Sequence, residues 1–266
     1  MFIASDTDIG KKRSENQDRV HAEFLADNVA VAVVCDGMGG ASSGGVASQL
    51  AIDAVVKRIK ENFRKDMKPN SIRNLMLTSV HYANTIVYGK SKEDIDKNGM
   101  GTTCVAALVV DKTVYMVSVG DSRGYLLTKD GIAQITTDHT YVEMLYRSGQ
   151  ITKEEAKNHH MRNVITKAVG VESDVEVDYF ELEENDNFRN IVLCHYPIPC
   201  FKNHYYGWYH LYGHVHNSFE YQMMEHDKYL MQELYGKQCQ MFNVGAMMPY
   251  MDYTPRTLDE ILKGAS

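Results

Sequence analysis

The sequence lacks the features that mark nucleic-acid-binding and membrane proteins. Its 28 lysine and arginine residues are outnumbered by 35 aspartate and glutamate residues, and the formal net charge is -7. No basic block is present to attract a polyanion. The longest apolar run near the start, residues 29–35, is far shorter than a membrane span, and the first six residues show no leader pattern. We therefore expect a cytoplasmic protein with small or protein-borne substrates and with no nucleic-acid or membrane partner.

Cysteine and proline are scarce, and each scarcity excludes a type of architecture. The five cysteines are odd in number and widely scattered, which predicts reduced, buried thiols and no disulfide framework. No proline-rich or glycine- and serine-rich stretch divides the chain. This argues against domains that are joined by a flexible linker.

The composition nevertheless changes near residue 188. Residues 1–187 contain 11 aromatic residues and one proline, whereas residues 188–266 contain 15 aromatic residues and four prolines. The change falls between a polar turn at 183–187 and the strand-like segment 191–194. We therefore predict two parts, 1–187 and 188–266, which are joined inside a structural layer.

The first part has the patterns of an α+β fold. Apolar residues at helical spacing predict helices over 44–64 and 71–90. Short strand-like runs separated by turn signals predict an antiparallel meander of 103–110, 113–119 and 125–128. Further strands are expected at 29–35 and 175–182, and further helices at 138–148 and 152–158. The last helix begins with a capping-box pattern, Thr152 followed by Glu155.

Residues 36–40, Asp-Gly-Met-Gly-Gly, follow directly after the predicted strand 29–35. This order leaves the Asp36 carboxylate at an open sheet edge, beside glycine backbone that a ligand can approach. Hard divalent cations prefer such oxygen ligands, and paired ions are a recurrent means of activating water against phosphate esters. By itself, Asp-Gly is more often only a tight turn.

Five other short motifs accompany this segment in a fixed order along the chain. They are residues 13–18 (Arg-Ser-Glu-Asn-Gln-Asp), 101–103 (Gly-Thr-Thr), 120–123 (Gly-Asp-Ser-Arg), 138–139 (Asp-His) and 162–170 (Arg-Asn-Val-Ile-Thr-Lys-Ala-Val-Gly). Together the six motifs resemble those of the PPM-type, metal-dependent serine/threonine protein phosphatases of bacteria, over roughly residues 3–187. The resemblance implies a β-sandwich flanked by helices, an αββα fold.

The resemblance also implies a role for individual residues. Arg13 would clamp the substrate phosphate with its planar guanidinium. Asp36 would bridge two manganese or magnesium ions, and Gly37 would add a carbonyl ligand. Asp18 would hold a metal ion or its water, and Asp121 would hold a third ion. The implied reaction is direct hydrolysis by metal-activated water, without a phosphoenzyme.

The chain departs from this family pattern in two ways. Gln17 stands where many members carry glutamate, so the second metal is expected to bind more weakly. The family continues with a strand that ends in Ser-Asp-Gly and with a later Asp-Asn pair, whose acids ligate the first metal. Here His195 follows the strand, and neither acid is found. His195 is an alternative ligand, although a shift of one residue reverses the side-chain direction. His139 is expected at the surface or beside the phosphate.

Three histidines are the candidate ligands of the second part. His195 follows one predicted strand, while His214 and His216 follow another and point the same way on an extended chain. Such a set suits iron, manganese or zinc. With the downstream segments 243–246 and 253–260, this part resembles the C-terminal portion of calcineurin-like metallophosphoesterases. It would replace the last strands of the phosphatase fold, but the ligands that such enzymes carry earlier in the chain are missing.

Three hypotheses about function follow. The first is a PPM-type protein serine/threonine phosphatase, with either full or reduced activity, which would bind two or three manganese or magnesium ions. It would act as a monomer on phosphorylated serine and threonine proteins, with a cognate kinase as a further partner. The second is a non-catalytic chimeric or remnant protein in which neither metal site is complete. The third is catalysis by the metallophosphoesterase segment.

Overall fold

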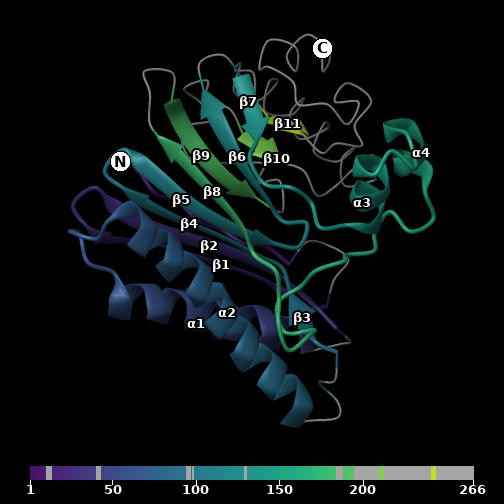
Figure 1. Ribbon diagram of the computed structural model, residues 1–266, viewed down its shortest axis with the longest axis horizontal. Helices are drawn as coiled ribbons and strands as arrows, with labels where there is room; N and C mark the ends of the chain where they lie inside the picture. Colours follow the sequence, from purple (N-terminus) through teal and green to yellow (C-terminus); the bar gives the residue numbers. More distant parts are fainter. Residues whose placement is uncertain are drawn as a thin grey trace, which may run out of the picture. The chain divides into compact units, whose positions relative to one another are not determined.

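The structure, a computed structural model, describes most of the chain (Figure 1). The described residues are 1–9, 14–39, 43–93, 97, 99–128, 131–183, 188–194, 210–212 and 241–243. The chain divides into two compact units, which are Met1–Gly124 with Ile135–Asp186, and Tyr125–Gln134 with Asn187–Ser266.

The first unit is built on an antiparallel sheet with the strand order β1-β2-β4-β5-β8. These strands span Asp18–Ala26, Val29–Met38, Cys104–Val110, Thr113–Val119 and Asp178–Glu183, and the short β3, Gly101–Thr102, pairs with β2. The most continuous valine- and alanine-rich runs form β2 and β4. These two strands are adjacent inside the sheet, where such residues are buried on both faces.

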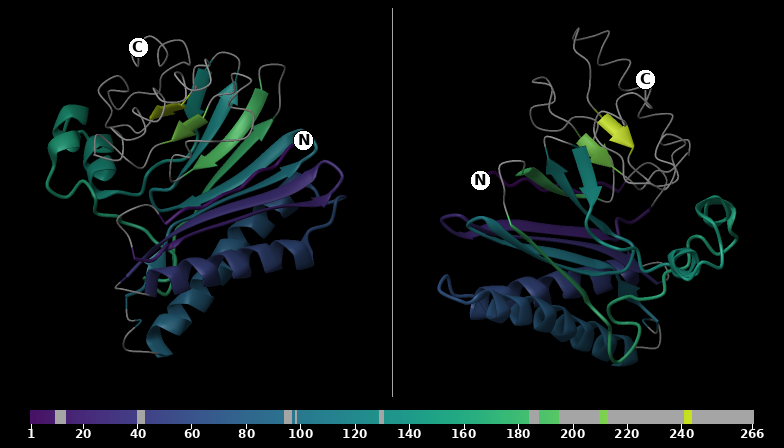
Figure 2. Two further views of the ribbon diagram at one scale, coloured as in Figure 1. Left: turned by 180° about the vertical axis from the view of Figure 1, so that it is seen from behind. Right: turned by 45° about the horizontal axis from the view of Figure 1, so that its top comes forward.

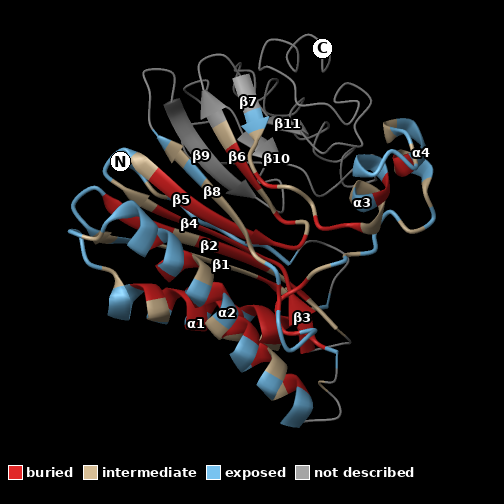
Figure 3. Ribbon diagram, in the orientation of Figure 1, coloured by how far each residue is buried: buried red, intermediate tan, exposed pale blue. Residues whose placement is uncertain are grey.

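Two long helices cover one face of this sheet (Figures 1 and 2). They are α1, Ser43–Asn62, and α2, Pro69–Glu93. Proline suits the start of α2 because a first-turn N–H has no partner within the helix. Buried residues recur along α1 and α2 at helical spacing (Figure 3). The two helices confirm the predicted segments 44–64 and 71–90.

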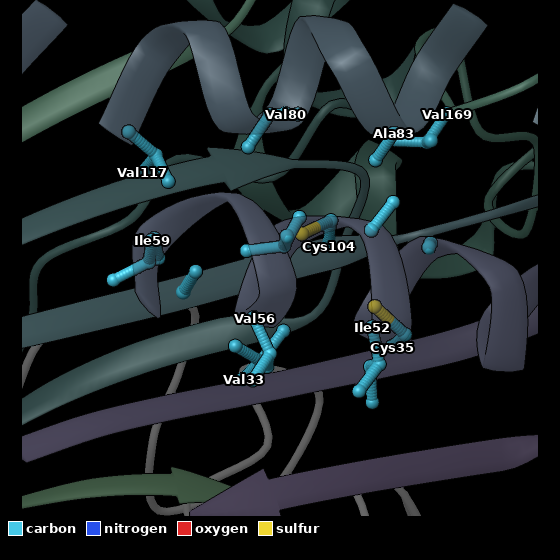
Figure 4. Close-up of a cluster of buried hydrophobic side chains, with 14 of the residues drawn as sticks. Val33, Cys35, Ile52, Val56, Ile59, Val80, Ala83, Cys104, Val117 and Val169 are labelled. Carbon is cyan, nitrogen blue, oxygen red and sulfur yellow. The ribbon is translucent and has the colours of Figure 1, made fainter. Parts of the chain in front are cut away.

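The core of the first unit lies between these helices and the sheet (Figure 4). Val33 and Cys35 of β2, Cys104 of β4 and Val117 of β5 are all fully buried there. Full burial of a valine side chain contributes roughly 1.5–3 kcal/mol. Because successive strand residues point to opposite faces, Asp36 projects from the face that is turned away from the helices.

Two of the five cysteines belong to this core, and both are free thiols. Burial raises the pKa of the Cys35 thiol well above its ordinary value, and a hydrogen bond with Cys104 raises it further. This confirms the prediction of reduced, buried thiols for Cys35 and Cys104. The other three side chains lie outside the described part.

The predicted meander is only partly correct. β4 and β5 pair as predicted, but residues 125–128 belong to β6, Arg123–Thr128, which pairs with β7, Gly131–Gln134. The neighbour of β5 is instead β8. The chain turns away after β5 at Gly120, whose φ of +99° favours glycine.

Two short helices, α3 (Tyr141–Arg147) and α4 (Lys153–Asn158), lie within the predicted helices 138–148 and 152–158. The capping box of α4 is confirmed. The Thr152 hydroxyl accepts a hydrogen bond from the Glu155 N–H at 3.2 Å, and the Glu155 carboxylate accepts one from the Thr152 N–H at 2.7 Å.

The second unit contains a three-stranded sheet with the order β7-β6-β9, in which β9 spans Phe188–Cys194. This strand confirms the one predicted at 191–194. β10, His210–Tyr212, pairs in parallel with β11, Met241–Asn243. Across the described ranges, no helix combines the length and apolar character that crossing a membrane requires.

Candidate functional site

Strand register places Asp18 of β1 directly opposite Asp36 of β2. The Gly37 N–H donates to the Gln17 carbonyl at 3.1 Å, so 17 and 37 form a hydrogen-bonded pair and 18 and 36 the alternating non-hydrogen-bonded pair. Side chains at such positions are close, with Cβ atoms about 4.5–5.5 Å apart. Asp18 is 9% exposed. Like charges directly opposite one another are destabilising, so this pair of carboxylates favours a cation.

The segment before β1 is fixed to its neighbours. The Asn16 side-chain oxygen accepts a hydrogen bond from the Asp18 N–H at 3.0 Å. The Gln17 carbonyl, which accepts from Gly37, also accepts from the Ser48 hydroxyl of α1 at 2.6 Å. These bonds attach the start of β1 to both β2 and α1, and they fix the backbone that carries Asp18.

Gly37 lies against the first turn of α1. A Cβ at Gly37 would be 2.0 Å from the Gly44 carbonyl oxygen, and a Cβ at Gly44 would be 2.7 Å from the Gly37 carbonyl oxygen. The Gln17 side-chain Oε1 atom is also near Gly44, 2.8 Å from the position of such a Cβ. Only glycine permits these approaches of backbone to backbone. The two glycines therefore bring carbonyl and amide oxygens together, one residue from Asp36.

Thr103 fixes the backbone of Asp36. Its hydroxyl accepts a hydrogen bond from the Asp36 N–H at 2.8 Å, and its own N–H donates to the Asp36 carbonyl at 2.9 Å. The Thr102 hydroxyl donates to the same carbonyl at 2.9 Å. Thr103 is fully buried, and its hydroxyl also bonds the Ser122 hydroxyl at 2.6 Å. The sequence motif 101–103 thus orients Asp36, a role that the sequence alone did not indicate.

Asp121 follows β5 at the same end of the sheet. Its predecessor Gly120 packs on Thr103, because a Cβ at Gly120 would lie 2.6 Å from the Thr103 Cγ2 atom. The turn that carries Asp121 therefore lies beside the end of β2. Asp121 itself is half-buried.

The motif Asp138-His139 contacts this turn and the residue that follows it. Arg123 Nε donates to both carboxylate oxygens of Asp138, at 2.9 and 3.1 Å. His139 is 7% exposed, and its Nδ1 atom accepts a hydrogen bond from the Gly120 N–H at 3.1 Å. The prediction that His139 lies at the surface was wrong. Its ring is buried because it binds the backbone of Gly120 in the turn.

The last motif, residues 162–170, joins the same region through backbone hydrogen bonds. Thr102 and Val169 exchange two of them, at 3.0 and 2.9 Å, and the Thr166 N–H donates to the His139 carbonyl at 2.8 Å. Parts of all six motifs are therefore connected at one end of the first unit. Arg13, His195, His214 and His216 lie outside the described residues.

The donors described here suit manganese or magnesium in their chemistry. The Asp18, Asp36 and Asp121 carboxylates and the Gly37 carbonyl all present oxygen, which hard divalent cations prefer. In the parts of the chain that the structure covers, no three His, Cys, Asp or Glu side chains come close enough together to hold a metal ion. Asp18 and Asp36 thus form a pair of candidate metal ligands.

Comparison with known proteins gives consistent results. The family described as protein phosphatase 2C matches residues 10–188. The serine/threonine phosphatase stp of Listeria monocytogenes is 39% identical over 180 residues, which are 68% of this chain and 71% of that protein. Protein phosphatase PhpP of Streptococcus pneumoniae is 30% identical over 202 residues, covering 72% and 80%. The crystal structure of Stp1 from Staphylococcus aureus matches with a TM-score of 0.63 and 38% identity, covering 68% of this chain and 70% of that one.

Proposed function

The chain belongs to the protein phosphatase 2C family, and we propose that its catalytic centre is the end of the β1–β2 sheet that carries Asp18, Asp36, Gly37 and Asp121. It is a protein serine/threonine phosphatase, a phosphoric monoester hydrolase. Its substrates are phosphorylated serine and threonine proteins.

The observation that carries the proposal is the placement of Asp18 opposite Asp36. Two carboxylates so placed repel each other and would also repel a phosphate dianion. A cation between them removes both repulsions. When bound there, manganese or magnesium would supply positive charge that activates water and stabilises charge on the phosphoryl group.

The residues of the chain then have separate tasks. Thr102 and Thr103 hold the Asp36 backbone in place, and the Gly37 carbonyl would be a further oxygen ligand for an ion. Asp121 would hold a further ion. Arg13, as the resemblance implies, would bind two phosphate oxygens with its guanidinium.

We infer that the first metal is bound weakly. The acidic ligands that the family supplies after its later strand are not found in this sequence, and the family match ends at residue 188. The same observation favours the second candidate, a non-catalytic chimeric protein. The metallophosphoesterase segment with His195, His214 and His216, the cognate kinase, the monomeric state and the cytoplasmic location stay predictions.

The test is release of inorganic phosphate from a phosphothreonine peptide by the purified full chain, with Mn²⁺ and after chelation. The proposal predicts release that depends on Mn²⁺ and needs a higher Mn²⁺ concentration than a relative with the full ligand set. No release at any Mn²⁺ concentration would support the non-catalytic candidate. Release that survives complete chelation would contradict the metal assignment.

A further inference from the structure

The buried residue His139 forms hydrogen bonds with both the N–H and the carbonyl of Gly120, the residue before Asp121. The Gly120 N–H donates to His139 Nδ1 at 3.1 Å, and the His139 N–H donates to the Gly120 carbonyl at 2.9 Å. On its far side, the His139 ring places Nε2 3.2 Å from Asp178 Oδ2, at the start of β8. His139 thus joins the turn to a strand of the sheet.

We propose that His139 is a positioning residue, which grips Gly120 through its Nδ1 atom and its backbone N–H and thereby fixes the direction of the Asp121 carboxylate. The proposal rests on the assignment of Asp121 as a metal ligand in the proposed function. It adds a residue that does not itself contact the ion.

The turn needs such support because of its backbone. Gly120 has a φ of +99° and packs on Thr103 so closely that a Cβ would lie 2.6 Å from Cγ2. Glycine is therefore required there, yet glycine is also the least restricted residue in conformation. A second constraint must hold the turn in one conformation, and the two bonds to His139 supply it.

The ring can play this part in only one tautomer. Nδ1 accepts the Gly120 N–H, so it carries no hydrogen, and in the neutral ring the hydrogen is on Nε2, which lies 3.2 Å from Asp178 Oδ2. Asp178 is itself held in the sheet, because it pairs with Ser118 of β5. The partner of one ring nitrogen thus sets the role of the other.

The opposite side of the turn is held independently. The Ser122 hydroxyl bonds the Thr103 hydroxyl at 2.6 Å, and Thr103 binds the Asp36 backbone. Asp121 therefore lies between a residue fixed by His139 and a residue fixed by Thr103. The contact between Ser122 and Thr103 links the turn to Asp36, because Thr103 also binds the Asp36 backbone. The contact between Gly120 and His139 links the turn to β8.

Two conservative substitutions separate the functions of the two ring nitrogens. In His139→Asn the amide oxygen takes the place of Nδ1 and can accept from Gly120, while the contact with Asp178 is lost. In His139→Gln the amide reaches the place of Nε2 and can donate to Asp178, while the acceptor for Gly120 is lost. His81→Gln, at an exposed position of α2, is the matched control.

The measurements are Mn²⁺ binding by titration calorimetry, the melting temperature, and hydrogen exchange of the Gly120 N–H by NMR. We expect His139→Gln to weaken binding of one Mn²⁺ ion by about 10- to 100-fold and to expose the Gly120 N–H to exchange. His139→Asn should keep both close to wild type, and His81→Gln should change neither. The wild type should also show a scalar coupling between the Gly120 nitrogen and His139 Nδ1, which needs no variant.

Other outcomes overturn the proposal in distinguishable ways. If His139→Gln binds Mn²⁺ as the wild type does while the wild type releases phosphate, only the role of His139 is wrong. If both variants lose binding in proportion to a lowered melting temperature, His139 is merely structural. Absence of the coupling excludes the hydrogen bond. A wild type that binds no Mn²⁺ removes the proposed function and this inference together.

Discussion

Asp36 depends on its neighbours as much as on its own carboxylate. Its importance could be predicted from the sequence, because a strand followed by Asp-Gly is a local pattern. Its surroundings could not, because Thr103, which binds its backbone, and Ser122, which binds Thr103, belong to segments that are distant in the chain. The wrong prediction of a surface position for His139 has the same cause, since Gly120, the residue that its ring binds, lies 19 residues earlier.

The Thr103 hydroxyl is expected to matter for both stability and activity. Thr103→Val keeps the shape of the side chain but leaves the buried Asp36 N–H without its acceptor, which costs about 1–3 kcal/mol. The free energy of unfolding in urea measures this loss, and Mn²⁺-dependent activity should fall with it. Thr103→Ser keeps the hydroxyl and is the control. A valine variant as stable as the wild type would show that this hydrogen bond is not needed.

Helices and strands could be predicted from the sequence where the pattern of apolar residues extended over the whole element. Both long helices, β2, β4 and β5 were predicted close to their observed bounds, because continuous apolar runs and helical spacing extend over whole elements. β1 was missed, although Val20–Phe24 alternates between apolar and polar residues in the manner of a half-buried edge strand. The exit of β6 from the meander was missed because pairing depends on the direction that the chain takes after Gly120.

The capping box of α4 gives a dependence on pH. The Glu155 carboxylate accepts hydrogen bonds from the Thr152 N–H and from the Thr152 hydroxyl. These bonds lower the pKa of Glu155 below the ordinary value of 4.5, and the bond from the N–H has the larger effect. Because the folded pKa is the lower one, this contribution to stability is present above the unfolded pKa. It is lost as the pH falls through the folded pKa. The stability difference between wild type and Glu155→Ala should therefore be present at neutral pH and vanish in acid.

An NMR titration of the Glu155 carboxyl carbon checks the cause. Its midpoint should lie below 4.5 in the wild type. It should rise only part of the way toward that value in Thr152→Ala, because this substitution removes the hydroxyl and keeps the backbone N–H. An unchanged midpoint in that variant would show that the Thr152 hydroxyl does not contribute to the lowered pKa.

The molecule combines a family match up to residue 188 with a remainder of different composition. The matched segment contains the sheet, the two long helices and every described candidate ligand. The metallophosphoesterase segment in the remainder stays a prediction, and its histidines His195, His214 and His216 lie outside the described residues. Substitution of the Asp18, Asp36 and Asp121 carboxylates therefore tests the proposed catalytic centre directly.

Metal binding should stabilise the whole molecule. An ion that binds only the folded state adds stability by mass action, about 2.7 kcal/mol at a free concentration 100 times the dissociation constant. Mn²⁺ should therefore raise the melting temperature of the wild type, and EDTA should reverse the rise. Asp36→Asn should lose most of the shift, whereas Asp66→Asn, in the exposed turn between α1 and α2, should keep it. Equal shifts in both variants would place the bound ion elsewhere.

We expect the carboxylates of the first part, and not the histidines of the second, to carry the phosphatase activity. The most direct measurement is the rate of Mn²⁺-dependent phosphate release from a phosphothreonine peptide by Asp36→Asn and His214→Ala, side by side with the wild type. We predict a loss on the order of 100-fold or more for Asp36→Asn and a rate near wild type for His214→Ala. An active Asp36→Asn protein together with an inactive His214→Ala protein would contradict this expectation.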